Sequence, residues 1–189
     1  TGTSLACALQ TDGRVRCATV GTASYLVPGP FVALTVGQGH ACALNSNGFP
    51  TCWGENGAGQ ARPVPWDMLK ISAGDQHTCA LDIHGMPVCW GSNSAGQSTP
   101  VGGPYVGITA GGAHTCAIDA AGVVTCWGDN TMGQSAPPSG PFSTISAGGN
   151  HTCALTPAGL VECWGDNSQG QAGNPLGTFT TIDAYANHT

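Results

Sequence analysis

The stretch ISAGGNHTCALTPAGLVECWGDNSQGQ, residues 145–171, contains the unit from which most of this chain is built. In it Cys153 begins a Cys-Ala-Leu segment, Cys163 follows ten residues later, and Gly159 lies four residues before that second cysteine. The arrangement occurs five times, with first cysteines separated by 35, 37, 37 and 37 residues. A nearly constant period of this length predicts a repeat architecture in which each unit packs against its neighbours. The cysteine pairs are Cys7 and Cys17, Cys42 and Cys52, Cys79 and Cys89, Cys116 and Cys126, and Cys153 and Cys163.

The repeats divide a single predicted domain, residues 1–189. The first unit is degenerate, because Cys17 is followed by Ala18-Thr19 where the other units have Trp-Gly. A chain of this length is large enough to bury a substantial core. The expected units lie near 1–30, 31–67, 68–104, 105–141 and 142–178, followed by a half repeat at 179–189.

Each full unit is predicted to form three strands. Its polar tail, which ends in Gly-Gln, is expected to lead to a short fourth strand or a loop. The second strand contains His-x-Cys-Ala-Leu or a close variant, and the third ends in Cys-Trp-Gly after a glycine turn typical of hairpins. The second strand carries small residues on one face, which predicts a closely approaching sheet there. The first strand alternates branched and small residues, with Trp66 expected to supply the aromatic near Met68. The expected first strands are 31–36, 68–73, 105–110, 142–147 and 179–184.

The composition excludes several classes of protein. Charged residues make up 7% of the chain, but hydrophobic residues reach 41% in a regular pattern, which favours a folded repeat protein over disorder. Four Lys and Arg residues cannot form the basic surface that nucleic acids require. No apolar run is long enough to cross a bilayer, and no signal peptide is visible, as expected of a mature secreted chain.

Ten cysteines at one fixed pair spacing favour disulfide bonds and an oxidising, extracellular compartment. Two antiparallel strands around the glycine turn can place the paired cysteines opposite each other, within reach of a cross-strand bond. The alternative is zinc, because a histidine stands two residues before a cysteine in four of the units. Zinc modules usually bring cysteines closer together in sequence, so we expect neither a metal nor another cofactor. The four histidines are His40, His77, His114 and His151.

The repeated polar and aromatic side chains have both functional and structural interpretations. The four Cys-Trp-Gly tryptophans can form sugar-stacking platforms, although packing between sheets is the more usual role. The histidines can form a pH-sensitive or metal-binding ring, although hydrogen bonds within the preceding glycine-rich corner are expected. Glu55, Asp129 and Asp166 occupy equivalent positions, whereas glycosidases need two carboxylates in different environments, so we expect no enzyme. The tryptophans are Trp53, Trp90, Trp127 and Trp164.

Two Asn-x-Thr sequons begin at Asn150 and Asn187. They are candidate glycosylation sites in a secreted protein, and their equivalent repeat positions would place both glycans on one rim. The alternative is that the sequon arises only because the repeat motif contains Asn-His-Thr, and carries no glycan.

The pattern Gly-x-x-His-x-x-Ala-Leu, then Gly, then Trp-Gly-x-Asn-x-x-Gly-Gln resembles the repeat of the regulator-of-chromosome-condensation family. The resemblance covers nearly the whole chain and is weakest over residues 1–30. It implies an all-β propeller, here of about five blades, with four strands in each blade. The founding member of that family acts on a small GTPase and chromatin, and a secreted bacterial member inhibits β-lactamases. The paired cysteines depart from the nuclear pattern and argue against a nuclear role.

The two ends of the chain carry complementary parts of one unit. Residues 179–189 contain the first strand that residues 1–20 lack. Pairing within one chain would close a five-bladed ring. Pairing between chains would give a head-to-tail contact that can grow into a filament, and a third alternative is a segment of a longer array. Residues 184–189 duplicate the register of residues 1–6, which favours the last two alternatives.

Together these observations predict a non-enzymatic, extracellular structural or protein-binding propeller. We expect a protein partner or self-association, and neither a nucleic acid nor a membrane span. The alternative functions are a carbohydrate-binding lectin, for which glycans would be the ligands, and a secreted enzyme inhibitor.

Overall fold

The computed structural model describes residues 5–189 as five three-stranded antiparallel sheets. None of these residues forms a helix that is long and apolar enough to cross a membrane. In chain order, the sheets are β1 (Leu5–Leu9), β2 (Val15–Thr19) and β3 (Tyr25–Val27); β4 (Phe31–Val36), β5 (His40–Asn45) and β6 (Pro50–Gly54); β7 (Met68–Ala73), β8 (His77–Asp82) and β9 (Pro87–Gly91); β10 (Gly107–Ala110), β11 (His114–Ile118) and β12 (Val124–Gly128); and β13 (Thr144–Ala147), β14 (His151–Leu155) and β15 (Val161–Gly165).

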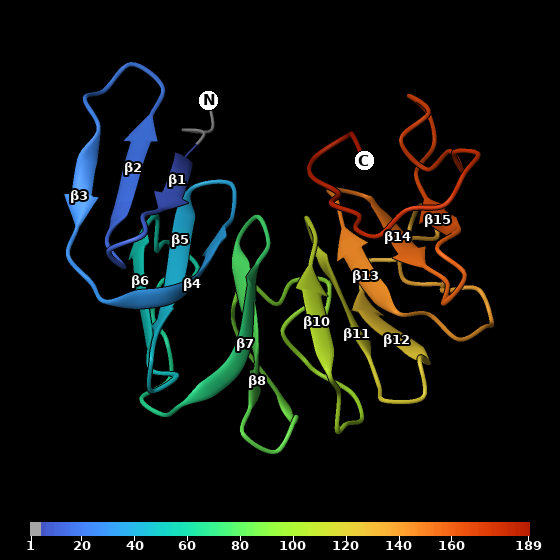
Figure 1. The fold of residues 1–189 in the computed structure, drawn as a ribbon, viewed down its shortest axis with the longest axis horizontal. Helices are drawn as coiled ribbons and strands as arrows, with labels where there is room; N and C mark the ends of the chain where they lie inside the picture. The colour runs from blue at the N-terminus through green and yellow to red at the C-terminus, as the bar shows by residue number, and fades with distance from the viewer. Residues whose placement is uncertain (1–4) are drawn as a thin grey trace.

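The sheets follow one another around an open arc, with the first and last sheets at its two ends (Figure 1). Of the three alternatives for the chain ends, closure into a five-bladed ring within this chain does not occur: β1 pairs only with β2, and residues 179–189 lie beside the last sheet. Residues 179–184 were expected to form a strand but do not, because no neighbouring strand supplies their hydrogen-bond partners. Each sheet has three strands where the resemblance implies four. Among residues 1–20, which form most of the degenerate first unit, positions 1–4 lie outside the described residues.

The disulfide bond lies in the hairpin β1–β2 of the first sheet and in the hairpin between the second and third strands of each of the other four sheets. In all five units the two cysteines occupy directly opposed positions of the ladder, and their sulfur atoms lie 2.03–2.05 Å apart. The turn glycines have φ between +77° and +83°. In the fourth sheet Asp119 closes the turn, since its Oδ1 accepts the backbone N–H groups of Ala121 and Val123 at 2.9 Å. The predicted disulfide pairing is confirmed, and none of the described cysteines is free.

The two faces of each second strand contact different neighbouring sheets. On β11, Cys116 and Ile118 pack with Phe142 and Ala154 of the following unit. On the opposite face Ala117 packs with the preceding sheet, and it is fully buried. An alanine at this position allows the two backbones to approach closely, as its place in the repeat predicts. The core is therefore a series of thin layers between sheets.

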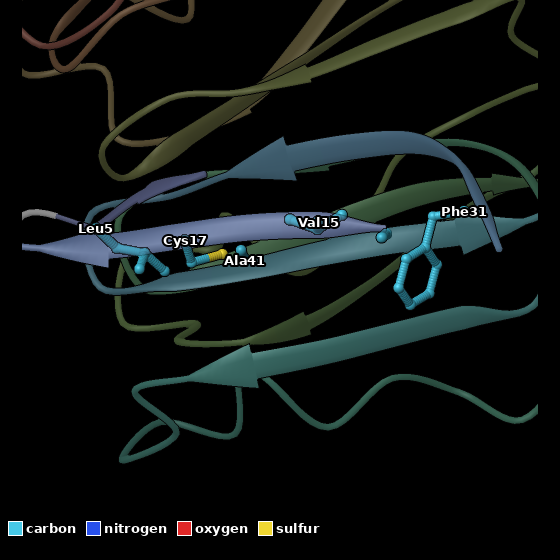
Figure 2. Close-up of a cluster of buried hydrophobic side chains, with 6 residues drawn as sticks. Leu5, Val15, Cys17, Phe31 and Ala41 are labelled. Atoms are coloured by element: carbon cyan, nitrogen blue, oxygen red, sulfur yellow. The ribbon is translucent and has the colours of Figure 1, made fainter. Parts of the chain in front are cut away.

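Among the described residues, the first boundary contains a cluster of apolar side chains. Leu5 and Cys17 of the first sheet lie beside Ala41 of the second, and Phe31 covers the end of the same cluster (Figure 2). At the next boundary Met68 is buried and itself occupies the position of the aromatic residue. The expectation that Trp66 supplies this aromatic is wrong, because Trp66 is 47% exposed in a connection outside the layer.

Removing one disulfide should destabilise the fold without changing its topology. Each bond joins cysteines 10 residues apart, so the Cys116→Ala, Cys126→Ala double variant should lose about 3 kcal/mol of unfolding free energy. Urea denaturation measures this loss. The Cys79→Ala, Cys89→Ala variant removes a bond that closes a loop of equal length, so it serves as the matched control, with an equal loss expected. Free thiols in the unreduced wild-type protein would contradict the pairing.

Two glycines with the same backbone conformation separate strain from close contact. Gly122 and Gly133 have φ of +82° and +84°. A Cβ at Gly122 would lie 2.6 Å from the Phe142 carbonyl oxygen, whereas one at Gly133 meets nothing within 4 Å. Gly133→Ala should therefore cost about 1–2 kcal/mol, the penalty of the left-handed conformation. Gly122→Ala should cost distinctly more by thermal or urea denaturation, and equal losses would show that the close contact does not matter.

Candidate functional site

The repeated histidines form buried links between consecutive units. All four are fully buried, and each Nε2 lies 2.7–2.9 Å from the hydroxyl of a threonine in the following unit. The prediction of hydrogen bonds within the glycine-rich corner is therefore wrong: the partner comes from the next repeat. The pairs are His40 with Thr78, His77 with Thr115, His114 with Thr152, and His151 with Thr189.

The threonine hydroxyl determines which ring nitrogen carries the proton. Thr115, for example, donates its hydroxyl proton to the carbonyl oxygen of Gln97 at 3.1 Å. Since a hydroxyl has only one proton, Nε2 of His77 must donate to Thr115, which leaves Nδ1 unprotonated. That Nδ1 is buried without a hydrogen-bond partner, as it is in the other three histidines. The arrangement thus requires a neutral ring.

Burial of these rings lowers their pKa values. For His40, His77 and His114 the pKa falls to about 4, chiefly because the charged form loses its hydration, and the pKa of His151 is also lowered. Neighbouring histidines add to the effect for His77 and His114. Across residues 5–189 no three His, Cys, Asp or Glu side chains gather as a metal site would require.

The Cys-Trp-Gly tryptophans pack between units. Trp127 is 6% exposed, and its indole N–H donates to the Gln97 carbonyl oxygen at 2.9 Å, the same oxygen that accepts the Thr115 hydroxyl. Trp90 and Trp164 make the equivalent bonds to the units before them. The indole nitrogen of Trp53 has no partner, because the degenerate first unit lacks the Gly-Gln tail. These contacts direct the polar edge of each ring inward.

The repeated carboxylates stabilise the loops that follow each tryptophan. Asp129 accepts the side-chain N–H of Gln134 at 2.9 Å and the backbone N–H of Thr131 at 3.0 Å. Asp166 makes the same bonds with Gln171 and Ser168, at 2.9 Å each. Backbone and side-chain donors from Ser168 lower the pKa of Asp166. Asp129 and Asp166 therefore each fix their own Gly-Gln loop.

Both predicted glycosylation asparagines lie on exposed corners. Asn150 and Asn187 are exposed immediately before the position of the second strand, and the Asn150 carbonyl oxygen accepts the backbone N–H of Asp166 at 2.8 Å. The two corners are adjacent, since the Gly149 N–H donates to the Ala186 carbonyl oxygen at 2.7 Å. Glycosylation of either side chain stays a prediction.

An exposed apolar surface lies at the end of the sheets that carries the glycine turns, and sequence reasoning missed it. We call it the turn-face patch and define it as Val32, Leu69, Ile83 and Val106, which are 52–62% exposed. Two adjoining depressions share Leu69 and Ile83 in their walls. Lys70 and His84 line the second depression. The sequence did contain a signal for this patch. In three successive units an apolar residue directly follows the large residue at the start of the expected first strand.

Acid should destabilise the layers between units. An unfolded histidine titrates near pH 6.5, whereas His40, His77 and His114 titrate near 4 in the fold. The unfolded chain therefore binds more protons between these values, so stability is complete above pH 6.5 and falls as pH falls towards 4. Replacing one histidine, as in His114→Leu, should reduce the slope by up to about 1.4 kcal/mol per pH unit. Urea denaturation from pH 4 to 8 measures it, and an unchanged slope would contradict the assignment.

The first boundary suggests a way to rescue a broken histidine link. Leu5 and Ala41 stand where later units have histidine and threonine. Thr152→Ala should lower the unfolding free energy by about 1–3 kcal/mol, because it leaves Nε2 of the buried His114 without a hydrogen-bond partner. Adding His114→Leu recreates the apolar pair and should recover part of that loss. Additive losses in urea denaturation of the single and double variants would show that the two side chains act independently.

Comparison with known proteins agrees with this architecture. Residues 69–97, 105–134 and 142–171 match the family described as the regulator of chromosome condensation (RCC1) repeat. A search of curated protein sequences finds no match.

Solved structures share the fold over most of this chain. The ectodomain of the receptor kinase CR4 from Physcomitrella patens is 29% identical with a TM-score of 0.73, over 92% of this chain and 54% of that one. The CRINKLY WD40 ectodomain of Arabidopsis thaliana ACR4 is 23% identical with a TM-score of 0.79, over 95% and 67%. Prp20p from Saccharomyces cerevisiae is 19% identical with a TM-score of 0.80, over 94% and 60%.

This chain therefore spans about half of the CR4 ectodomain, and its arc is an incomplete propeller. Three of its units match a known repeat directly, and the other two sheets share their disulfide and hairpin geometry. Residues 69–97, 105–134 and 142–171 are therefore repeats of the RCC1 family, in a chain that carries one disulfide bond in each of its five sheets.

Proposed function

We propose that this chain is a non-enzymatic, extracellular protein-binding module and that it binds through the turn-face patch. Five disulfides support an oxidising location, and the receptor-kinase ectodomain that the chain resembles at 29% identity supports an extracellular one. The repeated histidines and tryptophans hold the units together and the aspartates fix loops within units, which leaves the surface to carry the function.

The turn-face patch carries the proposal because its apolar residues are exposed and local. Val32, Leu69 and Val106 occupy one repeat position and are 62%, 61% and 52% exposed. The same position is Ser143 in the fifth sheet and Thr180 beyond it. Packing of the sheets does not require an apolar residue there, since the fifth sheet forms without one. A contiguous exposed apolar surface is a typical protein-interaction site.

The charges near the patch indicate the chemistry of its partner. Lys70 lines the depression between the third and fourth sheets and is one of only four basic residues in the chain. Arg14 and Asp12 form the one ion pair between side chains of residues 5–189, so Lys70 is not in one. Asp67 lines the other depression, so a partner segment with apolar side chains and a carboxylate placed beside Lys70 would complement this surface.

The alternative functions have less support. A lectin would need exposed aromatic rings on which sugars can stack. The indole N–H groups of Trp90, Trp127 and Trp164 instead donate hydrogen bonds to carbonyl oxygens of the preceding units. A secreted enzyme inhibitor would use a protein-binding surface of the same kind and differs only in its partner. Self-association through the ends of the arc involves a different surface from the patch.

An array of secreted and cell-surface proteins tests the proposal. We expect at least one ligand that binds the wild type, with affinity reduced at least tenfold in the Leu69→Glu, Ile83→Glu variant, because two charges then face an apolar partner. Val20→Glu is the matched control, since Val20 is 84% exposed but lies in the β2–β3 turn, outside the patch. Equal binding by all three proteins would reject the patch, and binding confined to a glycan array would support the lectin instead.

A further inference from the structure

Two equivalent depressions lie side by side on the turn-face patch. The first is at the boundary between the second and third sheets, and the second is at the boundary between the third and fourth. Val32 and Leu69 in the first depression occupy the repeat positions that Leu69 and Val106 occupy in the second. Leu69 and Ile83 line both depressions, so they form the ridge between them. The patch therefore offers two neighbouring sites of the same design.

Buried apolar residues form the floor of each depression. Leu44 and Met68 line the first depression and pack together beneath it. Leu81 and Tyr105 hold the same repeat positions in the second and also pack together. The two depressions have volumes of about 320 and 380 Å³. Each one thus combines an apolar floor, an exposed apolar rim and enough room for a large side chain.

The turns that frame the depressions are held by hydrogen bonds. Beside the first depression, Asn45 Oδ1 accepts the backbone N–H of Asn47 at 2.9 Å. The Gly48 carbonyl oxygen accepts the Met68 N–H at 2.9 Å, which ties this turn to the next unit. Equivalent bonds form beside the second depression, both at 2.8 Å. A frame that is fixed before binding loses little conformational entropy when a ligand enters.

The two depressions differ in charge. Asp67 lines the first, and Pro104 takes its position in the second. Lys70 lines the second, and Ala33 takes its position in the first. Asp82 is close to the second depression in sequence, but its Oδ1 accepts two backbone N–H groups of its own turn. A ligand that spans both depressions therefore meets a negative charge at one end and a positive charge at the other.

The spacing of the depressions restricts the backbone of such a ligand. They lie at successive sheet boundaries, and packed sheets are about 10 Å apart, so their centres are separated by about the same distance. In a polyproline II segment, residues i and i+3 share one side and lie about 9.3 Å apart. Residues i and i+2 of a β-strand are only about 6.7 Å apart. An α-helix spans the distance with residues i and i+7, but its intervening turn then lies on the ridge of Leu69 and Ile83.

We propose that the turn-face patch binds a proline-rich, polyproline II segment of a partner protein. Two large apolar side chains, three residues apart in that segment, fill the two depressions. A cationic residue at one end of the segment lies beside Asp67, and a carboxylate at the other end lies beside Lys70. This inference rests on the proposed function, because it names the kind of segment that the patch accepts.

Selection from a random dodecapeptide library displayed on phage tests the proposal. The full chain is the target, and the Leu69→Glu, Ile83→Glu variant removes peptides that bind elsewhere. We expect the remaining peptides to share proline, large apolar residues at i and i+3, and opposite charges at their two ends. The synthetic consensus peptide should bind saturably in fluorescence anisotropy. Serine in place of either apolar residue should weaken binding at least tenfold, because one depression then stays unfilled.

Charge reversal tests the orientation of the segment. The consensus peptide with glutamate in place of its cationic residue should bind the wild type at least threefold more weakly, and Asp67→Lys should restore that binding. Lys70→Glu should weaken binding of the original peptide at least threefold. Val20→Glu is the matched control and should leave it unchanged, since Val20 is exposed outside the patch.

Several outcomes would overturn the inference. They are enrichment of apolar residues at helical or strand spacing, no enrichment at all, and equal binding by the charge variants. The proposed function survives each of them if a protein from the array binds the wild type and loses affinity for the Leu69→Glu, Ile83→Glu variant. Equal binding of array proteins by both chains would reject the patch, and the inference with it.

Discussion

The boundaries between the later repeats depend on one buried threonine hydroxyl. It accepts a hydrogen bond from a histidine of the preceding unit and donates one to the glutamine carbonyl of the same preceding unit. Both partners are removed from water, so an unsatisfied group at this point would carry a full desolvation cost. Because the hydroxyl donates its only proton to that carbonyl, the histidine must carry its proton on Nε2 and remain neutral. The disulfide then fixes the hairpin on which the threonine lies.

Much of this architecture follows from the sequence because the residues that determine each hairpin recur in every unit. The cysteine spacing predicts the cross-strand bond, since residues equidistant from a hairpin turn face each other. The alanine opposite the cysteine face predicts the close neighbouring sheet. Such features are local, and five copies present them together.

Features that depend on long-range geometry were not predictable. The histidine pattern does not reveal that its partner lies 38 residues away, because hydrogen bonds within the corner satisfy the same sequence. Complementary ends do not determine whether an arc closes, since closure depends on the rotation between successive sheets. The turn-face patch was missed because an alternating strand accepts apolar residues on either face, and only the fold shows that Val32 and Leu69 are exposed.

The apolar boundary between the first two sheets has a consequence for how the arc comes apart. Leu5 and Ala41 meet there without an ionisable group, whereas each later boundary contains a buried imidazole. In a linear array each layer contributes separately to cohesion. In weak acid the histidines of the later junctions bind protons only when the chain unfolds, which weakens those junctions and leaves the first unchanged. The amino-terminal pair of sheets is therefore the part of the arc best able to keep its shape.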